Sequence, residues 1–142
     1  MKKIIVSLFS IAVVSCSVNK TTTTEKNGLY EVLTQQSYGG GNIRVFEILS
    51  QPNEIKMLQN DEILNKKISA QDVQNSNFVI LNMGEKASGG YTIGIESVRE
   101  TDENIIIKVK ETAPKEGSMV TLAITYPFCV VKINSKKEII IQ

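Results

Sequence analysis

The stretch GYTIGIESVRETDENIIIKVKETA, residues 90–113, decides the fold class. Its first half alternates Tyr91, Ile93 and Ile95 with polar or small residues, and its second half, NIIIKVKETA, follows a TDEN turn. Alternation with a period of two is typical of strands with one buried face. The stretch therefore predicts two β-strands joined by a short polar turn.

Further strand-like runs lie on both sides of this stretch. SNFVILNM (76–83) precedes it, and MVTLAITYPFCVVKIN (119–134) follows a PKEG turn. Nearer the N-terminus, two alternating runs flank the triple glycine of residues 39–41, which predicts two strands around a glycine turn. A phosphate-binding loop would instead lead directly into a helix. Together these runs predict a mainly β domain, a β-sandwich or a barrel-like antiparallel sheet of meander type.

The apolar residues of the last run change phase. From 120 to 126 they occupy even positions, whereas from 129 to 133 they occupy odd positions. Because a slip of one residue flips the faces of a strand, the chain must bend, bulge or loop at Pro127. We therefore expect a corner or exposed loop there, with Tyr126 and Phe128 beside it.

One segment has a helical period instead. SQPNEIKMLQNDEILNKK (50–67) offers Ser50 as an N-cap and Pro52 in the first turn. Apolar residues then recur at roughly helical spacing: Ile55, Leu58 and Ile63. This pattern predicts one α-helix packed on the sheet.

The N-terminus, MKKIIVSLFSIAVVSC, has the order of a lipoprotein signal. Two lysines precede an apolar run over residues 4–14, which is shorter than the roughly 20 residues that a bilayer span needs. The run ends in VVSC, which resembles the lipobox of bacterial lipoproteins, in which the cysteine becomes the acylated first residue. The alternative is a buried N-terminal strand or helix with an incidental cysteine.

This interpretation divides the chain into three parts. We expect a signal peptide over 1–15, a flexible polar tether over 16–27 that begins at a lipidated (palmitate-bearing) Cys16, and a single β-rich domain over 28–142. The expected location is the bacterial cell envelope, with the protein held at the outer membrane by its N-terminal lipid.

Composition limits the class of partner. The chain has 142 residues, 42% hydrophobic and 22% charged, which suits one globular domain. Its net charge of +1 argues against nucleic-acid binding. Removing two of the 16 basic residues with the leader leaves 14 against 15 acidic residues, so we expect a protein partner recognised through shape and backbone.

The residues available for chemistry predict no enzyme. The chain has no histidine, so Ser-His-Asp and Cys-His schemes and the imidazole ligands of zinc are absent. Cys129 lies among apolar residues and is expected to be a small buried hydrophobe. The acidic pairs at 61–62 and 102–103 lie in polar segments and are expected on the surface. We expect no catalytic residue, metal, cofactor or small-molecule substrate.

Two short segments are candidates for contact with a partner protein. Glycine pairs let a backbone approach another protein closely, and aromatic side chains are common interface anchors. In GEKASGGY these are Ser88, Gly89, Gly90 and Tyr91, and in TYPF they are Tyr126, Pro127 and Phe128. The alternative is a plain turn, with Tyr91 starting a strand and Phe128 filling a core.

These segments carry a family likeness. Residues 78–134 resemble the PrcB C-terminal domain, named for an accessory lipoprotein subunit of a bacterial surface protease complex. The matching pieces are a glycine loop that ends in SGGY (88–91), a Pro-x-x-Gly turn (114–117) and the Tyr-Pro-Phe segment (126–128). The resemblance implies a non-enzymatic envelope protein that associates with or stabilises another protein, with a protease as one candidate.

Two alternative functions remain open. SGGY and YPF are similar to the Thr-Thr-Gly-Tyr and Arg-Pro-Trp loops of chagasin-type inhibitors of cysteine proteases, which are β-sandwiches with a loop wedge at one end. In this chain Tyr126 replaces the arginine and Phe128 the tryptophan. The other alternative is a structural lipoprotein whose loop binds no specific partner.

Overall fold

The computed structural model describes residues 28–142. The predicted signal peptide, Cys16 and the tether up to residue 27 lie outside the described residues. Within the described part, no helix has the length and apolar character needed to cross a membrane.

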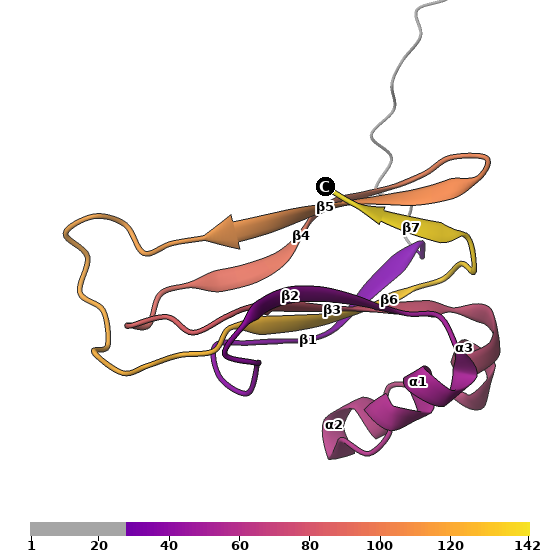
Figure 1. The fold of residues 1–142 in the computed structure, drawn as a ribbon, viewed down its shortest axis with the longest axis horizontal. Coiled ribbons are helices and arrows are strands. Elements are labelled where there is room, and N and C mark those ends of the chain that lie inside the picture. The colour runs from indigo at the N-terminus through magenta and orange to yellow at the C-terminus, as the bar shows by residue number, and fades with distance from the viewer. Residues whose placement is uncertain (1–27) are drawn as a thin grey trace, which may run out of the picture.

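Residues 28–142 form two β-sheets packed face to face, with helices on the outer face of the larger sheet (Figure 1). The four-stranded sheet has the order β1 (Tyr30–Gln36), β6 (Phe128–Ile133), β3 (Asn77–Met83) and β2 (Arg44–Leu49), with all neighbours antiparallel. The three-stranded sheet has the order β4 (Thr92–Glu100), β5 (Asn104–Thr112) and β7 (Glu138–Ile141). The predicted mainly β, sandwich-like fold is confirmed.

The two central strands of the larger sheet are apolar on both faces. In β3 and β6, Val79 lies opposite Val131 and Leu81 opposite Cys129, and all four are fully buried. This face packs on the three-stranded sheet, whose buried residues include Ile93, Val98, Ile105, Ile107 and Ile139. The other face forms a second core with the helices, which includes Phe78, Val130, Leu33, Ile55, Leu64, Ile68 and Val73. Strands covered on both sides read as nearly continuous apolar runs, as NFVILNM and FCVVKI do.

The predicted hairpin over residues 90–113 is confirmed. Strands β4 and β5 are antiparallel, and their turn is closed by the Thr101 amide donating to the Asn104 carbonyl at 2.8 Å. The Asn104 amide donates back to the Thr101 hydroxyl at 2.9 Å. The polar TDEN sequence therefore supplies its own turn hydrogen bonds.

The glycine turn at residues 39–41 is not the predicted reversal between paired strands. Both flanking strands exist, but β1 and β2 lie on opposite edges of the sheet, with β6 and β3 between them. The Gly40 amide donates to the Tyr126 carbonyl at 3.0 Å, and a Cβ on Gly40 would lie 2.7 Å from that oxygen. Gly40 is thus suited to a close backbone crossing at the end of β6.

The meander prediction is also wrong. Among the described strands, only β2–β3 and β4–β5 are neighbours both along the chain and in a sheet. The chain passes from β1 to the opposite edge of the same sheet at β2, and it crosses between the sheets at its other connections. Strand β7, which the sequence analysis did not assign, runs parallel to β5. Residues 119–126, predicted as a strand, contribute only one isolated bridge, between Thr125 and Lys86.

Three short helices replace the single predicted helix: α1 (Pro52–Leu58), α2 (Glu62–Asn65) and α3 (Ala70–Asn75). Pro52 lies in the first turn as predicted, but the N-cap is Gln51 and not Ser50. The Asp61 carboxylate accepts from the amides of Ile63 and Leu64, so it starts a new helix and interrupts the predicted one.

A largely buried lysine joins the sheet to the helices. The Lys132 ammonium lies 2.9 Å from the Glu31 carboxylate on β1 and 3.4 Å from the Asp72 carboxylate on α3. Burial would raise the pKa of Asp72, but hydrogen bonds from Ser69 and the charge of Lys132 outweigh it and hold the pKa below its usual 3.8. Asp72 is therefore charged in the folded protein at neutral pH.

Asp72→Asn is expected to lower the free energy of unfolding by about 1 kcal/mol at pH 7, because it weakens the cap of α3 and removes a charge facing Lys132. Since the folded pKa of Asp72 lies below the unfolded value of 3.8, its stabilisation is present above that pH and is lost as the pH falls through the folded value. Denaturant unfolding at pH 7 and at pH 3 measures the change. The loss in the free energy of unfolding caused by Asp72→Asn should be smaller at pH 3 than at pH 7. The exposed-turn control Asp102→Asn should leave the free energy of unfolding unchanged at both pH values. A loss that does not depend on pH would contradict a lowered pKa for Asp72.

Candidate protein-binding site

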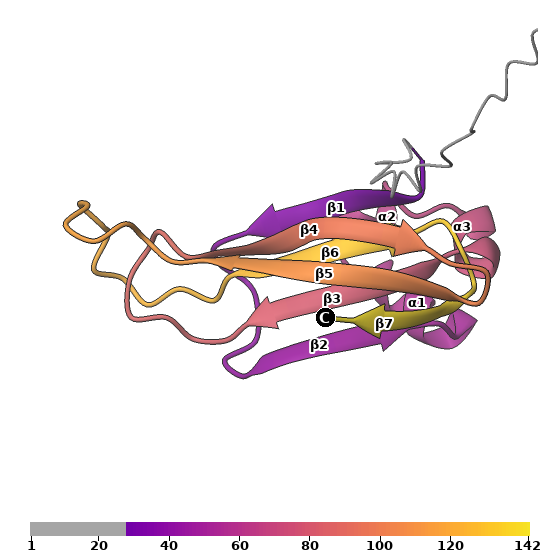
Figure 2. The ribbon, with the colours of Figure 1, turned by 90° about the horizontal axis from the view of Figure 1, so that it is seen from above.

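Three connecting segments gather at one end of the sandwich, on the left in Figures 1 and 2. They are residues 37–43 after β1, 84–91 between β3 and β4, and 113–127 between β5 and β6. We call this the loop end. The first described residue, Gly28, lies at the opposite end, because β1 runs from there toward the loops (Figure 2).

Backbone hydrogen bonds tie two of these segments together. Lys86 and Thr125 each donate an amide to the carbonyl of the other at 2.9 Å, and the Gly89 amide donates to the Thr121 carbonyl at 2.9 Å. The buried Thr125 hydroxyl also donates to the Ser88 carbonyl at 2.8 Å. The two predicted contact segments therefore lie side by side, with residues 121–125 held against 86–89.

The glycines form the surface on which the longer segment rests. Gly90 has a φ of +88°, and a Cβ there would lie 2.8 Å from the Pro114 Cβ and 3.4 Å from Val120. A Cβ on Gly89 would meet Thr121 at an ordinary 3.5 Å. Gly90 is thus needed both for its backbone conformation and for close packing against residues 114 and 120.

Tyr91 lies one residue before β4. It is half-buried and packs against the core between the sheets. The Lys86 ammonium lies 5.7 Å from the centre of its ring. Tyr91 therefore anchors the loop to the sandwich, as the plain-turn alternative expected.

The Tyr-Pro-Phe segment forms the predicted corner but is not an exposed loop. Pro127 is buried, and its carbonyl accepts from the Met83 amide at 2.9 Å. Phe128 begins β6 and packs against the helix-side core. The Tyr126 hydroxyl donates to the Glu85 carboxylate at 3.1 Å, and this hydrogen bond raises the pKa of Tyr126. The three residues mainly hold the loop end to β3 and β6.

Residues 77–134 match the PrcB C-terminal family model. The match confirms the resemblance and covers less than half of the 142-residue chain. No curated protein and no solved structure matched the chain.

The PrcB C-terminal segment, residues 77–134, corresponds to strands β3 to β6 and the two loops tied together between them. It therefore contains the centre of the larger sheet and the hairpin of the smaller one. The edge strands β1, β2 and β7 and the three helices lie outside the match.

Several exposed apolar side chains of the loop end are not among the contact residues that the sequence predicted. Met119 is fully exposed, Leu122 is 91% exposed and Ile124 is 54% exposed. The even-numbered alternation over 120–126 predicts a strand with Leu122 and Ile124 on one face, but these residues lie in no strand and both side chains are exposed. An alternating pattern identifies a shared face, but it does not say whether another element covers that face.

The other predicted features lie away from the loop end or are plainly structural. Cys129 is a free cysteine with no exposed surface, and burial raises its pKa to about 11. It is the expected buried hydrophobe. The acidic pairs at 61–62 and 102–103 are exposed, and residues 28–142 contain no group of three or more potential metal ligands.

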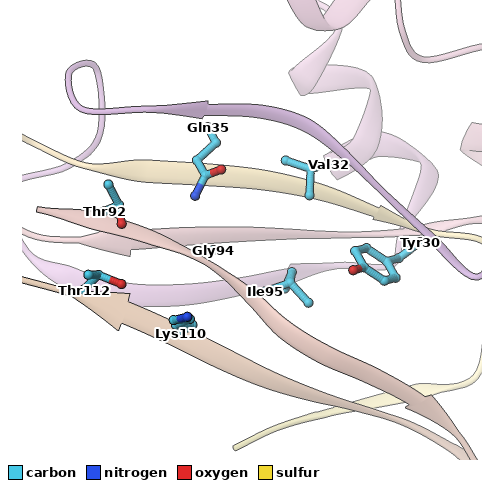
Figure 3. Close-up of a pocket in the computed structure, with 8 residues that line it drawn as sticks. All are labelled: Tyr30, Val32, Gln35, Thr92, Gly94, Ile95, Lys110 and Thr112. Carbon is cyan, nitrogen blue, oxygen red and sulfur yellow. The ribbon is translucent and has the colours of Figure 1, made fainter. Parts of the chain in front are cut away.

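A hollow of about 140 Å³ opens on the flank of the sandwich, between the edges of β1 and β4 (Figure 3). The Gln35 side-chain amide spans it and donates to the Ile93 carbonyl at 2.8 Å. A Cβ on Gly94 would lie 2.7 Å from that amide nitrogen, so Gly94 makes room for the bridge. The lining of the hollow includes one charged residue, Lys110, and no carboxylate. The lining residues are Tyr30, Val32, Gln35, Thr92, Gly94, Ile95, Lys110 and Thr112. The hollow therefore lacks the converging acidic and basic groups of a catalytic site.

Gly90→Ala is expected to lower the free energy of unfolding by ~2 kcal/mol, because alanine is strained at positive φ and its methyl group would meet Pro114. The matched variant Gly89→Ala should change it by less than ~0.5 kcal/mol, since its methyl group meets Thr121 at an ordinary distance. Denaturant unfolding of both variants measures the difference. Equal losses of stability in the two variants would contradict the close packing described at Gly90.

Proposed function

We propose that the protein is a non-enzymatic lipoprotein of the bacterial cell envelope that binds or stabilises a partner protein through the loop end. The match of residues 77–134 to the PrcB C-terminal family supports a role as an accessory component of a protease complex. An envelope or surface protease is therefore the leading candidate for the partner.

One observation carries the proposal: residues 84–91 and 113–127 are joined by backbone hydrogen bonds into one surface, at the end opposite Gly28. A lipid on Cys16 would attach on the Gly28 side. The twelve residues of 16–27 span at most ~40 Å when extended, so the anchor keeps the domain near the membrane. The loop end is then free to meet a protein away from the bilayer.

We propose a non-enzymatic function because the chain offers few side chains suited to catalysis. The whole chain lacks histidine. The described thiol, Cys129, is buried with its pKa raised, which makes it a poor nucleophile. The Tyr126–Glu85 pair is tied into the loop contact, and among residues 28–142 no second acidic or basic group hydrogen-bonds to it.

Inhibition of a cysteine protease is the second candidate. The observation that favours it is the contact between the two segments that resemble inhibitor loops, at one end of a sandwich. Against it, Pro127 is buried and Phe128 packs inward, so the Tyr-Pro-Phe segment does not project as a wedge.

Cross-linking in the native envelope, followed by affinity purification of the full chain, tests the proposal. We expect one envelope protein to co-purify reproducibly and to lose stability when this chain is deleted. We also expect mass spectrometry of the purified chain to show an acylated Cys16 as its mature N-terminus. An unprocessed N-terminus would contradict the proposal that the protein is a lipoprotein.

Loop-dependent inhibition of a papain-like protease at micromolar concentration or below would favour the second candidate. An unchanged set of cross-linked proteins after joint substitution of Gly89, Gly90 and Tyr91, with the fold intact, would favour a structural lipoprotein without a loop partner.

A further inference from the structure

We propose that residues 119–124 are the segment of the loop end that enters the partner, with Met119 and Leu122 as its apolar anchors. The site on the partner is then a protein groove with apolar pockets beside a strand edge, whose free backbone groups pair with this segment. This inference rests on the proposed function and names the contact residues and the chemistry of its partner.

The side chains of this segment are unusually exposed for their type. Met119, Leu122 and Ile124 are at least half exposed within six residues of chain. Two further apolar side chains, Tyr38 at 53% and Ile43 at 70%, belong to the 37–43 connection at the same end. Single exposed apolar residues are ordinary, but several within one short segment mark an interaction surface.

The backbone of the segment is equally unsatisfied. Residues 119–124 belong to no helix or strand, and within the described chain none of their amides donates a hydrogen bond. Their one internal backbone contact is the Thr121 carbonyl, which accepts from Gly89. Unpaired donors are what strand addition to a partner requires, and in an extended chain Leu122 and Ile124 would share one face while Met119 would lie on the other.

The segment is held in place although it is open. Val120 and Thr121 lie against Gly90 and Gly89, and Thr125 closes its C-terminal side through the pair with Lys86. The anchors at 119 and 122 therefore project from a braced backbone. A braced segment loses less conformational entropy when it binds.

The location of the segment favours a protein over a lipid surface. Gly28, from which the proposed lipid tether extends, lies at the far end of the sandwich. The tip beside the segment carries one charge of each sign, Lys115 and Glu116, so it offers no net attraction to anionic lipid headgroups. The neutral apolar surface suits a groove on a protein.

Photo-cross-linking of the full chain in the native envelope tests this inference. A benzophenone amino acid replaces Met119, Leu122, Tyr38 or, as a distant control, Ile63, which is 50% exposed on α2. We expect positions 119 and 122 to give adducts with one and the same protein, mapped to residues along a strand edge of that protein, and position 63 to give none.

Substitution then separates the contact from the fold. With the benzophenone at position 38 as reporter, Met119→Ser and Leu122→Ser should each reduce the adduct about tenfold, whereas the control Ile63→Ser should leave it unchanged. Because both side chains are solvent-exposed, thermal unfolding should not change. Undiminished adducts in both variants would overturn the inference and leave the proposed function standing. Adducts from further benzophenone probes at Ser88 and Tyr126, with none from 119 and 122, would do the same. Adducts to phospholipid would overturn the inference in favour of a membrane surface, and no adduct from any loop position would overturn the proposed function itself.

Discussion

The hydrogen-bonded register between β3 and β6 is the constraint on which the remaining structure depends. It sets Val79, Leu81, Cys129 and Val131 toward the smaller sheet, and it sets Phe78 and Val130 toward the helices. A slip of one residue would exchange these two faces. Both cores therefore depend on this one antiparallel pair, and β1 and β2 pair with its two outer edges.

The same register builds the loop end. Asn82 on β3 lies opposite Phe128 on β6, so the chain leaving β3 and the chain entering β6 run side by side beyond the sheet. The bond from the Met83 amide to the Pro127 carbonyl and the Lys86–Thr125 pair continue that ladder outward. The PrcB C-terminal match spans both strands and the two loops that these bonds join, whereas residues 37–43 of the loop end lie outside it.

Local sequence patterns predicted most of the strands, but they did not predict which strands pair or which apolar residues are buried by another element. The alternation in residues 90–113 and the TDEN turn predicted β4 and β5, because the hairpin that these strands form depends on contacts between residues close in sequence. The pairings of β1 with β6 and of β2 with β3 are long-range, so the triple glycine suggested a hairpin that does not exist. Residues 119–124 alternate like a strand while lying in solvent. Two helix signals were readable: Asp61 as an N-cap, which would have divided the predicted helix over 50–67, and Ser69 with Asp72 as a capping box, which would have predicted α3 beyond it.

Amide hydrogen exchange tests most directly the claim that the loop end is a braced surface with an unpaired segment. The amides of Lys86, Gly89 and Thr125 are internally bonded, whereas those of residues 119–124 are not. The account predicts slow exchange at the first three positions and fast exchange throughout 119–124 in the isolated protein, with the fast amides becoming protected when a partner binds. Protection of residues 119–124 in the isolated protein, or fast exchange at Lys86 and Thr125, would contradict it.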